Sequence, residues 1–416
     1  MNQPTNHDRV NRSKCRACGS SSLILYLPLG DQALANAFLS PENVNKPEPK
    51  FPLEVFYCGD CFHSQLGYTV DPDVMFKNYL YVSGTSDAIR KHFAEYAREV
   101  FDRFMKPGDL VVEVASNDGT LLKNFIPWGA KVLGVEPAEN IAKMANEDGV
   151  LTIPEWHTVE VAKKVVAEHG KAKAIIANNV FAHVDNLHEF AEASRELLAD
   201  DGVWTIESPH VLHMLQNNEF DTVYHEHIAY LSLYALIPFF KRHGLNLFDV
   251  QPTWVHGGSN RMFISKDMSL PQSDKLKEVL QAEIDFGINK PETYQKFRER
   301  VENVKVELLK LLADLKAQGK TIAGYGAAAK GQTLVQYFGI GTETLKWIAD
   351  KSPLKQDRLS PGLHIPIVSP DLIKTDAPDY LLILAWNFAD EIMRQQADFA
   401  AQGGKFIIPI PTPRIV

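Results

Sequence analysis

The chain has 416 residues, 45% of them hydrophobic and 23% charged, which is typical of a globular protein with about two to four domains. Its 52 Asp and Glu residues exceed its 43 Lys and Arg residues, and the net charge of −9 argues against general nucleic-acid binding. No apolar run approaches the roughly 18 residues of a membrane helix, and residues 1–14 lack the apolar core of a signal peptide. We therefore expect a cytoplasmic protein with a disordered tail over 1–14 and no membrane partner.

All four cysteines fall in two Cys-x-x-Cys pairs, Cys15 with Cys18 and Cys58 with Cys61. Such a turn points both sulfurs toward one centre, and two turns complete the tetrahedral shell that zinc prefers. Disulfides or free thiols are the alternative, but disulfides fit a cytosolic chain poorly. Four thiolates leave no coordination position for a substrate, so we predict a structural zinc ion. We interpret His63 as a neighbour of this site and not as a ligand.

The segment 15–75 contains short extended runs at 23–27 and 52–57, separated by Pro and Gly. It predicts a small zinc-binding β module that is too small for a core of its own without metal. Residues 86–106 then carry apolar side chains at helical spacing and stop at a Lys-Pro-Gly sequence, which predicts a helix.

Strands and helices alternate in the region that we assign to the next domain, 76–270. A helix is expected to open at 120–125, after a turn that contains Gly119. This alternation predicts a doubly wound parallel sheet. The expected strands are 109–115, 132–135, 174–177 and 203–206.

A charged helical stretch at 271–318 is expected to connect this domain to a second one at 319–416. In both halves a glycine turn follows the first strand, an acid follows the second and an Asn follows the third. We predict an α/β fold with a small N-terminal zinc-binding β module and two Rossmann-like doubly wound domains related by internal duplication. The expected strands of the last domain are 321–324, 345–349, 380–384 and 405–408.

Ligands of an open α/β sheet bind beyond the carboxyl ends of its strands, which places one candidate site in the first half. Glu136 ends the second strand, 17 residues after Gly119, and its carboxylate can accept both hydroxyls of a ribose. The turn lacks G-x-G-x-x-G, which favours a ligand with a ribose but no phosphate, such as S-adenosylmethionine (SAM). An ordinary strand–helix connection is the alternative. The candidate cofactor-binding residues are Glu113, Ser116, Asn117, Asp118, Gly119, Glu136, Pro137, Asn178 and Asn179.

The glycine turn of the second half, 324–331, contains G-x-G-x-x-A, and Asp350 follows the next strand. Taken alone, this pattern is a fair fingerprint of NAD binding. Lys330, however, puts a cation at the helix start where a phosphate would sit. Two interpretations therefore remain, NAD or the diphosphate of a nucleotide-linked substrate, with Lys351 and Lys355 close by in the sequence.

The run Tyr224-His225-Glu226-His227 is dense in groups that transfer protons. His227 beside Glu226 can act as a general base near neutral pH. H-E-x-x-H is absent, which excludes a zincin, but another metal site and a solvated loop remain as alternatives.

Together these motifs resemble the SAM-dependent sugar C-methyltransferases that act on nucleotide-linked keto-deoxysugars. The resemblance covers almost the whole chain from Cys15, and it depends on the order and spacing of the motifs. The matching segments are the two Cys turns, Tyr79–Ser86, Glu113–Gly119, Asn178–Val184, Tyr224–His227, Gly257–Ser259 and Gly324–Gly331.

The resemblance implies a zinc module, a SAM-binding domain and a domain for the substrate nucleotide. In this family a base removes a proton next to the sugar ketone, and the enolate attacks the methyl group of SAM. His227 matches the base, and the other matching catalytic residues are Glu226, Tyr224, His183 and one of Tyr79 and Tyr81. The implied substrate-binding residues are Ser83, Ser86, Lys330, Asp350, Lys351, Lys355 and Asn387.

The implied substrate is a dTDP-linked 4-keto-deoxysugar methylated at C-3, and we expect a monomer or weak oligomer. One departure is Glu155-Trp156-His157, where the family would have an aromatic pair near the adenine.

An α-proton of a ketone is only weakly acidic, so such a site needs both a base and donors to the enolate oxygen. An NAD-dependent oxidoreductase and a non-catalytic nucleotide-sugar binding protein are the two alternative functions.

Overall fold

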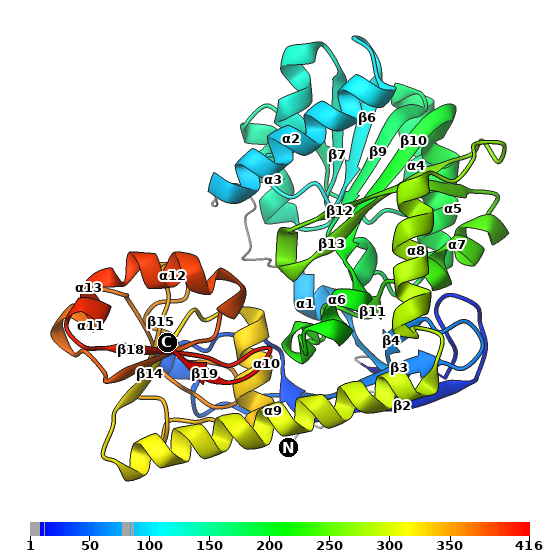
Figure 1. The fold of residues 1–416 in the computed structure, drawn as a ribbon. Coiled ribbons are helices and arrows are strands. Elements are labelled where there is room, and N and C mark those ends of the chain that lie inside the picture. Colours follow the sequence, from blue (N-terminus) through cyan, green and yellow to red (C-terminus); the bar gives the residue numbers. More distant parts are fainter. Residues whose placement is uncertain (1–8, 12, 77–83, 85–86) are drawn as a thin grey trace.

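The computed structural model describes residues 9–11, 13–76, 84 and 87–416 (Figure 1). Residues 9–11 of the expected tail form strand β1 (Arg9–Asn11), which pairs antiparallel with β5 (Tyr68–Val70). The prediction of a disordered tail is therefore wrong for these three residues. Four predicted site residues lie outside the described residues: Tyr79, Tyr81, Ser83 and Ser86.

The N-terminal module is a four-stranded antiparallel sheet with the order β11-β4-β3-β2. Both extended runs expected from the sequence are confirmed as strands of this sheet. The fourth strand, β11, comes from the next domain, so the module is not completed by its own residues. The bounds are β2 (Leu23–Ala33), β3 (Lys50–Cys58), β4 (Ser64–Leu66), β11 (Ala229–Tyr230), η1 (Pro41–Asn43) and α1 (Pro72–Phe76).

The central domain is built on a seven-stranded sheet with the order β12-β13-β10-β9-β6-β7-β8. Its five strands from β6 to β10 are parallel, as predicted. The sheet is not parallel throughout, because β12 and β13 form an antiparallel hairpin at the β10 edge that the sequence analysis did not predict. The bounds are β6 (Leu110–Val114), β7 (Lys131–Val135), β8 (Thr152–Ile153), β9 (Ala172–Asn178), β10 (Leu198–Pro209), β12 (Asn246–Thr253) and β13 (Ser259–Ser265).

Helices cover both faces of this sheet. Val111 and Ile176 pack on one face against helix residues such as Tyr96, whereas Val112 and Ile175 pack on the other face. This alternation follows from the two-residue period of a strand. The helix expected at 120–125 is a 3₁₀ helix, η3 (Leu122–Trp128), with Pro127 inside it. The other helices are α2 (Asp87–Phe104), α3 (Glu139–Glu147), α4 (Val159–His169), η4 (Phe181–His183), α5 (Leu187–Leu197), α6 (Val211–Gln216), η5 (Phe220–Thr222), α7 (Leu233–Arg242) and η6 (Val255–Gly257).

The C-terminal domain has a six-stranded sheet with the order β16-β15-β14-β17-β18-β19. From β16 to β18, neighbouring strands of this sheet are the third, second, first, fourth and fifth strands of the domain along the chain. The central sheet has the same order from β8 to β10. This agreement confirms two Rossmann-like domains of the same architecture, as predicted. The strands are β14 (Ile322–Tyr325), β15 (Ile348–Ala349), β16 (Ile367–Val368), β17 (Tyr380–Ile383), β18 (Lys405–Ile408) and the antiparallel β19 (Arg414–Ile415). The helices are α10 (Ala329–Phe338), α11 (Leu372–Thr375), η7 (Trp386–Phe388), α12 (Ala389–Gln395) and α13 (Ala397–Ala401).

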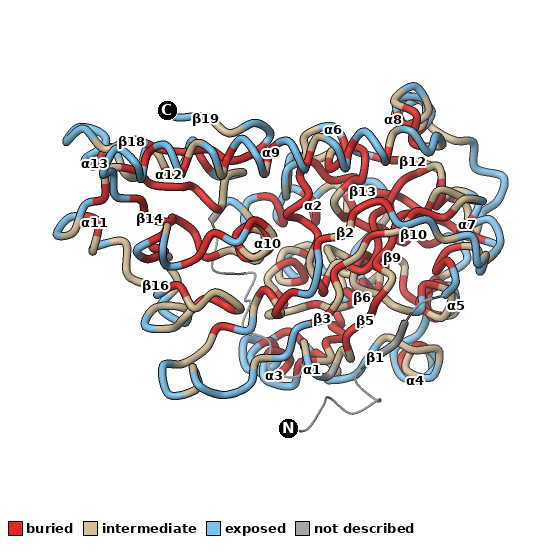
Figure 2. The backbone as a smooth tube through the Cα atoms, turned by 90° about the horizontal axis from the view of Figure 1, so that it is seen from below, coloured by how far each residue is buried: buried red, intermediate tan, exposed pale blue. Residues whose placement is uncertain are grey.

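The connector consists of α8 (Asp274–Phe286) and α9 (Pro291–Ala317), and α9 runs along both the module and the C-terminal domain (Figure 1). Phe297 of α9 shares one hydrophobic core with Leu53 of the module and Leu334 of α10. The module therefore completes its core with residues from distant parts of the chain. Figure 2 shows strands such as β9 and β10 among the buried backbone and α4, α13 and β19 at the exposed rim. None of the described helices is long and apolar enough to cross a bilayer.

Candidate active site and metal centre

The four cysteine sulfurs converge at the end of the N-terminal module and lie within 4.8 Å of one another. The Sγ atoms of Cys15 and Cys61 are 3.6 Å apart, and so are those of Cys18 and Cys58. Disulfide sulfurs would be about 2.05 Å apart. Four Zn–S bonds of about 2.3 Å in a tetrahedron place the sulfurs about 3.8 Å apart. The donor set and its spacing therefore fit a structural zinc ion.

His63 lies beside this centre but is not part of the four-sulfur cluster. Its side chain is fully buried, and neither ring nitrogen has a hydrogen-bond partner among the described residues. Burial lowers the pKa of His63 to about 4, so the ring is neutral at physiological pH. This placement agrees with the interpretation of His63 as a neighbour of the metal site.

Arg16, inside the first Cys turn, ties the metal centre to the central domain. Its side chain is 1% exposed and donates to the carbonyl of Leu66 at 2.5 Å and to Thr69 Oγ1 at 2.7 Å. It also forms an ion pair of 3.2 Å with Asp185, two residues after His183. The zinc turn thus supports the loop that carries a predicted active-site histidine.

The predicted cofactor residues meet at the carboxyl ends of β6, β7 and β9, because β6 lies between the other two strands. The turn after β6 has a left-handed backbone at Ala115, Asn117 and Gly119, with φ of +54°, +49° and +73°. A Cβ atom on Gly119 would also come within 2.9 Å of Val150. Such conformations are costly for residues other than glycine and concentrate at ligand-binding turns.

Glu136 ends β7, as predicted, and its carboxylate organises this turn. One oxygen accepts the backbone N–H of Asn117 and the other accepts that of Ala138, both at 2.9 Å. Burial raises the pKa of Glu136, and the two backbone hydrogen bonds act against that shift. Each carboxylate oxygen keeps a second acceptor position for a ligand hydroxyl.

Glu113 provides an acceptor that no described residue satisfies. The residue is 3% exposed, and its Oε2 is a buried atom without a hydrogen-bond partner in the described part of the chain. Burial raises the pKa of Glu113 well above its ordinary value, and the charges of Asp118 and Glu136 add to the shift. Asp118 in turn accepts the backbone N–H of Gly84 at 3.1 Å. Three carboxyl groups near one turn favour a cationic ligand, which fits the ammonium and sulfonium groups of SAM.

The remaining predicted cofactor residues lie along the same edge. Ser116 Oγ and Asn179 Oδ1 are both buried atoms that have no hydrogen-bond partner among the residues that the structure describes. Asn179 follows β9 with a left-handed φ of +52°, and its amide nitrogen is 3.4 Å from the side-chain oxygen of Asn178. Pro137 lies between Glu136 and its N–H donor, Ala138. Trp156, which follows β8, is 44% exposed.

The structure brings His183, Tyr224 and His227 together at the ends of η4 and η5. The hydroxyl of Tyr224 lies 2.7 Å from Nε2 of His227, and Nδ1 of His227 lies 2.8 Å from the carbonyl oxygen of Thr222. A carbonyl only accepts, so we assign the proton of neutral His227 to Nδ1, which leaves the lone pair on Nε2. The ring of His183 lies edge-on to that of His227, with centroids 4.9 Å apart. Nε2 of His227 therefore accepts from the hydroxyl of Tyr224, and a second imidazole lies beside the pair.

The other two residues of the Tyr-His-Glu-His run have different environments. His225 is buried and donates to the carbonyl of Phe51 at 3.2 Å, and burial lowers its pKa to about 4. It anchors the run to the module. Glu226 is 8% exposed, and one of its oxygens accepts from the amide of Asn36 at 2.6 Å.

The glycine turn of the C-terminal domain repeats the arrangement of the first. Asp350 ends β15 and accepts the backbone N–H of Ala327 at 2.7 Å, just as Glu136 accepts that of Asn117. The carbonyl of the same residue is also bound, because Lys355 donates to the carbonyl oxygen of Ala327 at 2.8 Å. The parallel supports the duplication at the level of single contacts.

Lys330 has a partner that the sequence analysis did not foresee. Its ammonium nitrogen lies 3.5 Å from the carboxylate of Glu219 and 5.0 Å from the centre of the Trp386 ring. Next to it, the indole N–H of Trp386 donates to the fully buried Asp221 at 2.6 Å. These contacts join the C-terminal domain to the loop that leads to His227.

Of the other predicted substrate residues, Lys351 is exposed and Asn387 lies in η7.

A buried acid at the end of β10 was also missed. Glu207 accepts from His92 Nε2 at 2.6 Å and from Arg261 Nη2 at 2.7 Å. Burial acts to raise the pKa of Glu207, but the hydrogen bond from His92 and the charge of Arg261 hold it below its ordinary value. The position of Glu207 at the end of a strand was the signal in the sequence that could have identified it. Its partner Arg261 could not be foreseen, because it lies on β13, a strand that was not predicted.

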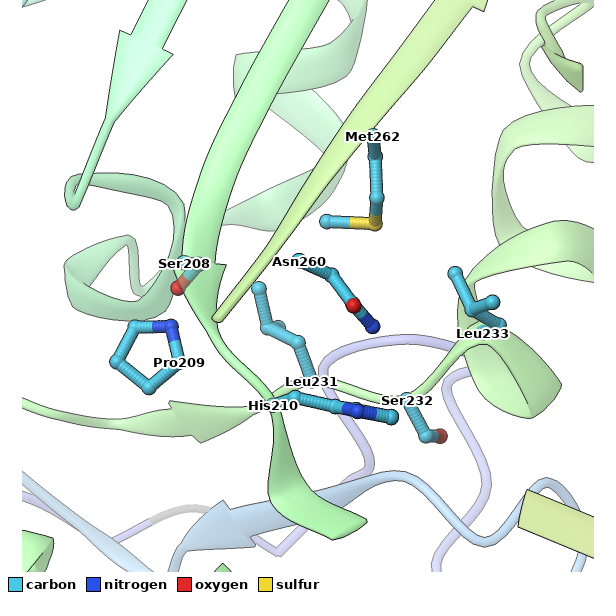
Figure 3. Close-up of a pocket in the computed structure, with 8 residues that line it drawn as sticks. All are labelled: Ser208, Pro209, His210, Leu231, Ser232, Leu233, Asn260 and Met262. Carbon is cyan, nitrogen blue, oxygen red and sulfur yellow. The ribbon is translucent and has the colours of Figure 1, made fainter. Parts of the chain in front are cut away.

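Two small pockets adjoin each other behind His227, and Pro209 and His210 line both. His227 lines one of them, together with apolar side chains such as Met214. The other lies between the end of β10 and the start of α7 (Figure 3). His210 itself is paired with the fully buried Glu283 at 2.6 Å. The second pocket is lined by Ser208, Pro209, His210, Leu231, Ser232, Leu233, Asn260 and Met262.

Three family models match the chain in succession: a zinc binding domain at 15–76, a methyltransferase domain at 89–250 and a C-methyltransferase C-terminal domain at 254–411. The chain is also similar to the C-methyltransferase NovU from Streptomyces niveus, with 38% identity over 405 residues, 97% of this chain and 96% of the relative. A solved SAM-dependent methyltransferase from Archaeoglobus fulgidus is 17% identical and covers 39% of this chain and 71% of its own, with a TM-score of 0.33. A SAM-bound magnesium protoporphyrin IX methyltransferase from Synechocystis is 15% identical and covers 42% and 78%, with a TM-score of 0.32.

Proposed function

The chain belongs to the family of SAM-dependent C-methyltransferases, and we propose that it methylates C-3 of a nucleotide-linked 4-keto-deoxysugar. The observation that carries this proposal is the assigned tautomer of His227. Its Nδ1 proton is held by the carbonyl of Thr222, so Nε2 is the basic nitrogen of the ring and accepts from the hydroxyl of Tyr224. A base of this kind, with donors around it, is what the removal of an α-proton from a ketone requires.

In the proposed mechanism, Nε2 of His227 takes the proton from the carbon next to the ketone. The electron pair of that C–H bond becomes the C=C bond of the enolate, and the π pair of the ketone moves onto its oxygen. Tyr224 would turn its hydroxyl from Nε2 of His227 to this oxygen when the substrate binds, and His183 would supply a second hydrogen bond to the developing charge. When bound, SAM would supply the activated methyl group to the enolate carbon, and the electron pair of the broken S–CH₃ bond would stay on sulfur as a neutral thioether. Glu113, Asp118 and Glu136 would hold SAM by its cationic groups and its ribose.

We assign the nucleotide, a dTDP group, to the C-terminal domain. The support is the cluster of polar groups at its glycine turn, where Asp350 binds the backbone N–H of Ala327 and Lys355 binds the carbonyl of the same residue. Lys330 at the start of α10 is the proposed contact for the diphosphate, and this contact requires it to exchange its ion pair with Glu219. Lys351 and Asn387 complete the proposed set.

The test is mass spectrometry of the purified protein incubated with SAM and a panel of nucleotide-linked 4-keto-deoxysugars. We expect a product heavier by one CH₂ group, and NMR of that product distinguishes C-3 from C-5. In D₂O, the α-hydrogen should exchange only in the presence of a functional base. A protein that binds SAM but methylates no member of the panel would contradict the proposed substrate class.

We also propose a cytoplasmic location and a monomeric or weakly associated state. A centre of four reduced thiolates suits a reducing compartment, where disulfides are rare. Size-exclusion chromatography with light scattering measures the association state directly.

A further inference from the structure

A segment of the zinc module reaches across to the Tyr-His-Glu-His run and contacts its acid. The amide Nδ2 of Asn36 lies 2.6 Å from Oε1 of Glu226. We propose that Asn36 is a positioning residue that holds the carboxylate of Glu226 in one orientation for the bound sugar. This inference rests on the proposed function, in which Glu226 orients the substrate and does not take the proton.

The charge environment of the pair suits this role. Glu226 is 8% exposed, and its charge, like that of Asp350, acts to raise the pKa of Lys355 against the effect of burial. An ionised carboxylate only accepts hydrogen bonds, and an amide NH₂ donates without adding a charge. Asn36 therefore supports the ionised form of Glu226 without competing with Lys355.

The backbone on both sides of Asn36 is held by the C-terminal domain. On one side, Ala33 donates to the side chain of Gln336 at 2.9 Å and accepts from it at 3.3 Å. On the other side, Leu39 and Leu359 exchange two backbone hydrogen bonds, of 3.0 Å and 2.8 Å. A side chain on so short and doubly anchored a segment is preorganised, which is what accurate positioning needs.

The ring of Phe38 adds a third link, because the ammonium of Lys355 lies 5.2 Å from its centre. The same segment therefore touches Glu226 of the central domain and Lys355 of the C-terminal domain. The zinc module in this view does more than stabilise the fold, since it carries a residue that shapes the active site.

The test compares kcat/KM for Asn36→Ala and Asn36→Asp with the wild type. The aspartate has the same shape as asparagine but puts a second negative charge against Glu226, so we expect it to lose about ten- to a hundredfold. The alanine variant should lose less. A purely space-filling role for Asn36 predicts the opposite order, because only alanine leaves a cavity.

A double variant isolates the contact. In a Glu226→Gln background the glutamine amide can donate to the aspartate, so Asn36→Asp should cost less than threefold there. Equal fold-losses in both backgrounds would overturn the proposal, because independent residues add. The matched control is Asn43→Ala, whose amide bonds only to Ser40 Oγ within the same segment among the described contacts. It should keep wild-type kinetics.

A measurement without substrate separates this inference from the proposed function. In protein labelled with ¹³C-glutamate, Glu226→Gln identifies the resonance of the Glu226 carboxyl. Asn36→Asp should raise the pKa of that carboxyl, and an unchanged titration would refute the positioning role whatever the substrate is. A wild-type protein that methylates no keto-sugar, with the titration shifted as expected, would refute only the proposed function.

Discussion

The buried carboxyl of Asp221 gives a stability prediction whose sign and size follow from its surroundings. Asp221 is fully buried between the loop of His227 and the C-terminal domain, and Trp386 donates to it at 2.6 Å. Burial raises the pKa of Asp221 from 3.8 to about 6, against the opposing effects of Lys330 and the Trp386 bond. The folded chain therefore holds this proton more tightly than the unfolded chain does.

The contribution of this group to the free energy of unfolding falls as the pH rises from about 4 to about 6, and it is level above that range. The difference between 3.8 and about 6 corresponds to about 3 kcal/mol at pH 7.5. Asp221→Asn removes the titration but keeps an oxygen to accept from the indole. We expect this variant to match the wild type near pH 4 and to be more stable by up to about 3 kcal/mol at pH 7.5.

The assay is urea denaturation at pH 4.5 and pH 7.5, followed by fluorescence. Asp314→Asn, which changes an exposed carboxylate on α9, is the control and should alter stability by less than about 0.5 kcal/mol at both pH values. An Asp221→Asn variant that is equally destabilised at both pH values would refute the reasoning, because it would mean that the ionised carboxylate is needed.

Four further outcomes are expected. Cys58→Ser should release zinc and lower the melting temperature before it alters the chemistry, because metal binding is coupled to folding; elemental analysis should find about one zinc per wild-type chain. His227→Ala should lower methyl transfer by about 10²–10⁴-fold while both ligands still bind, and near-normal α-hydrogen exchange in this variant would exclude His227 as the base. Glu136→Ala should weaken SAM binding about ten- to a hundredfold in calorimetry and leave nucleotide binding intact. Lys330→Ala should do the reverse, and an effect on SAM alone would contradict the assignment of the two domains.

Local patterns were sufficient to predict the main features of the fold. The four cysteines identified the metal centre because two tight turns carry all its donors. The parallel strands were recognised because strands covered on both faces are mostly apolar, as β6 illustrates: its five residues are all buried, and Glu113 is the single polar one among them. The hairpin of β12 and β13 was missed, since its strands are separated by residues 254–258, which were noted only for their glycines.

The candidate site was predictable only where one short segment supplies several groups. Tyr224 and His227 are three residues apart, and the structure bonds them to each other. Asn36 and Glu226 are 190 residues apart, and Asp221 and Trp386 are 165 apart. No local pattern links such positions, because their contact depends on how the domains pack. The choice between Tyr79 and Tyr81 stays a prediction, since both lie outside the described residues.

The shared core described above has a consequence for how the chain is made on the ribosome. The module is encoded first, but its sheet needs β11 near residue 230, and its core includes Phe297 of α9 and Ile410 near the C-terminus. The N-terminal cysteines therefore emerge long before the residues that bury the module. During synthesis the apolar face of β2 and β3, with Leu27 and Leu53, is made before the residues that cover it, and a chain ended before α9 would leave that face without Phe297 and Ile410.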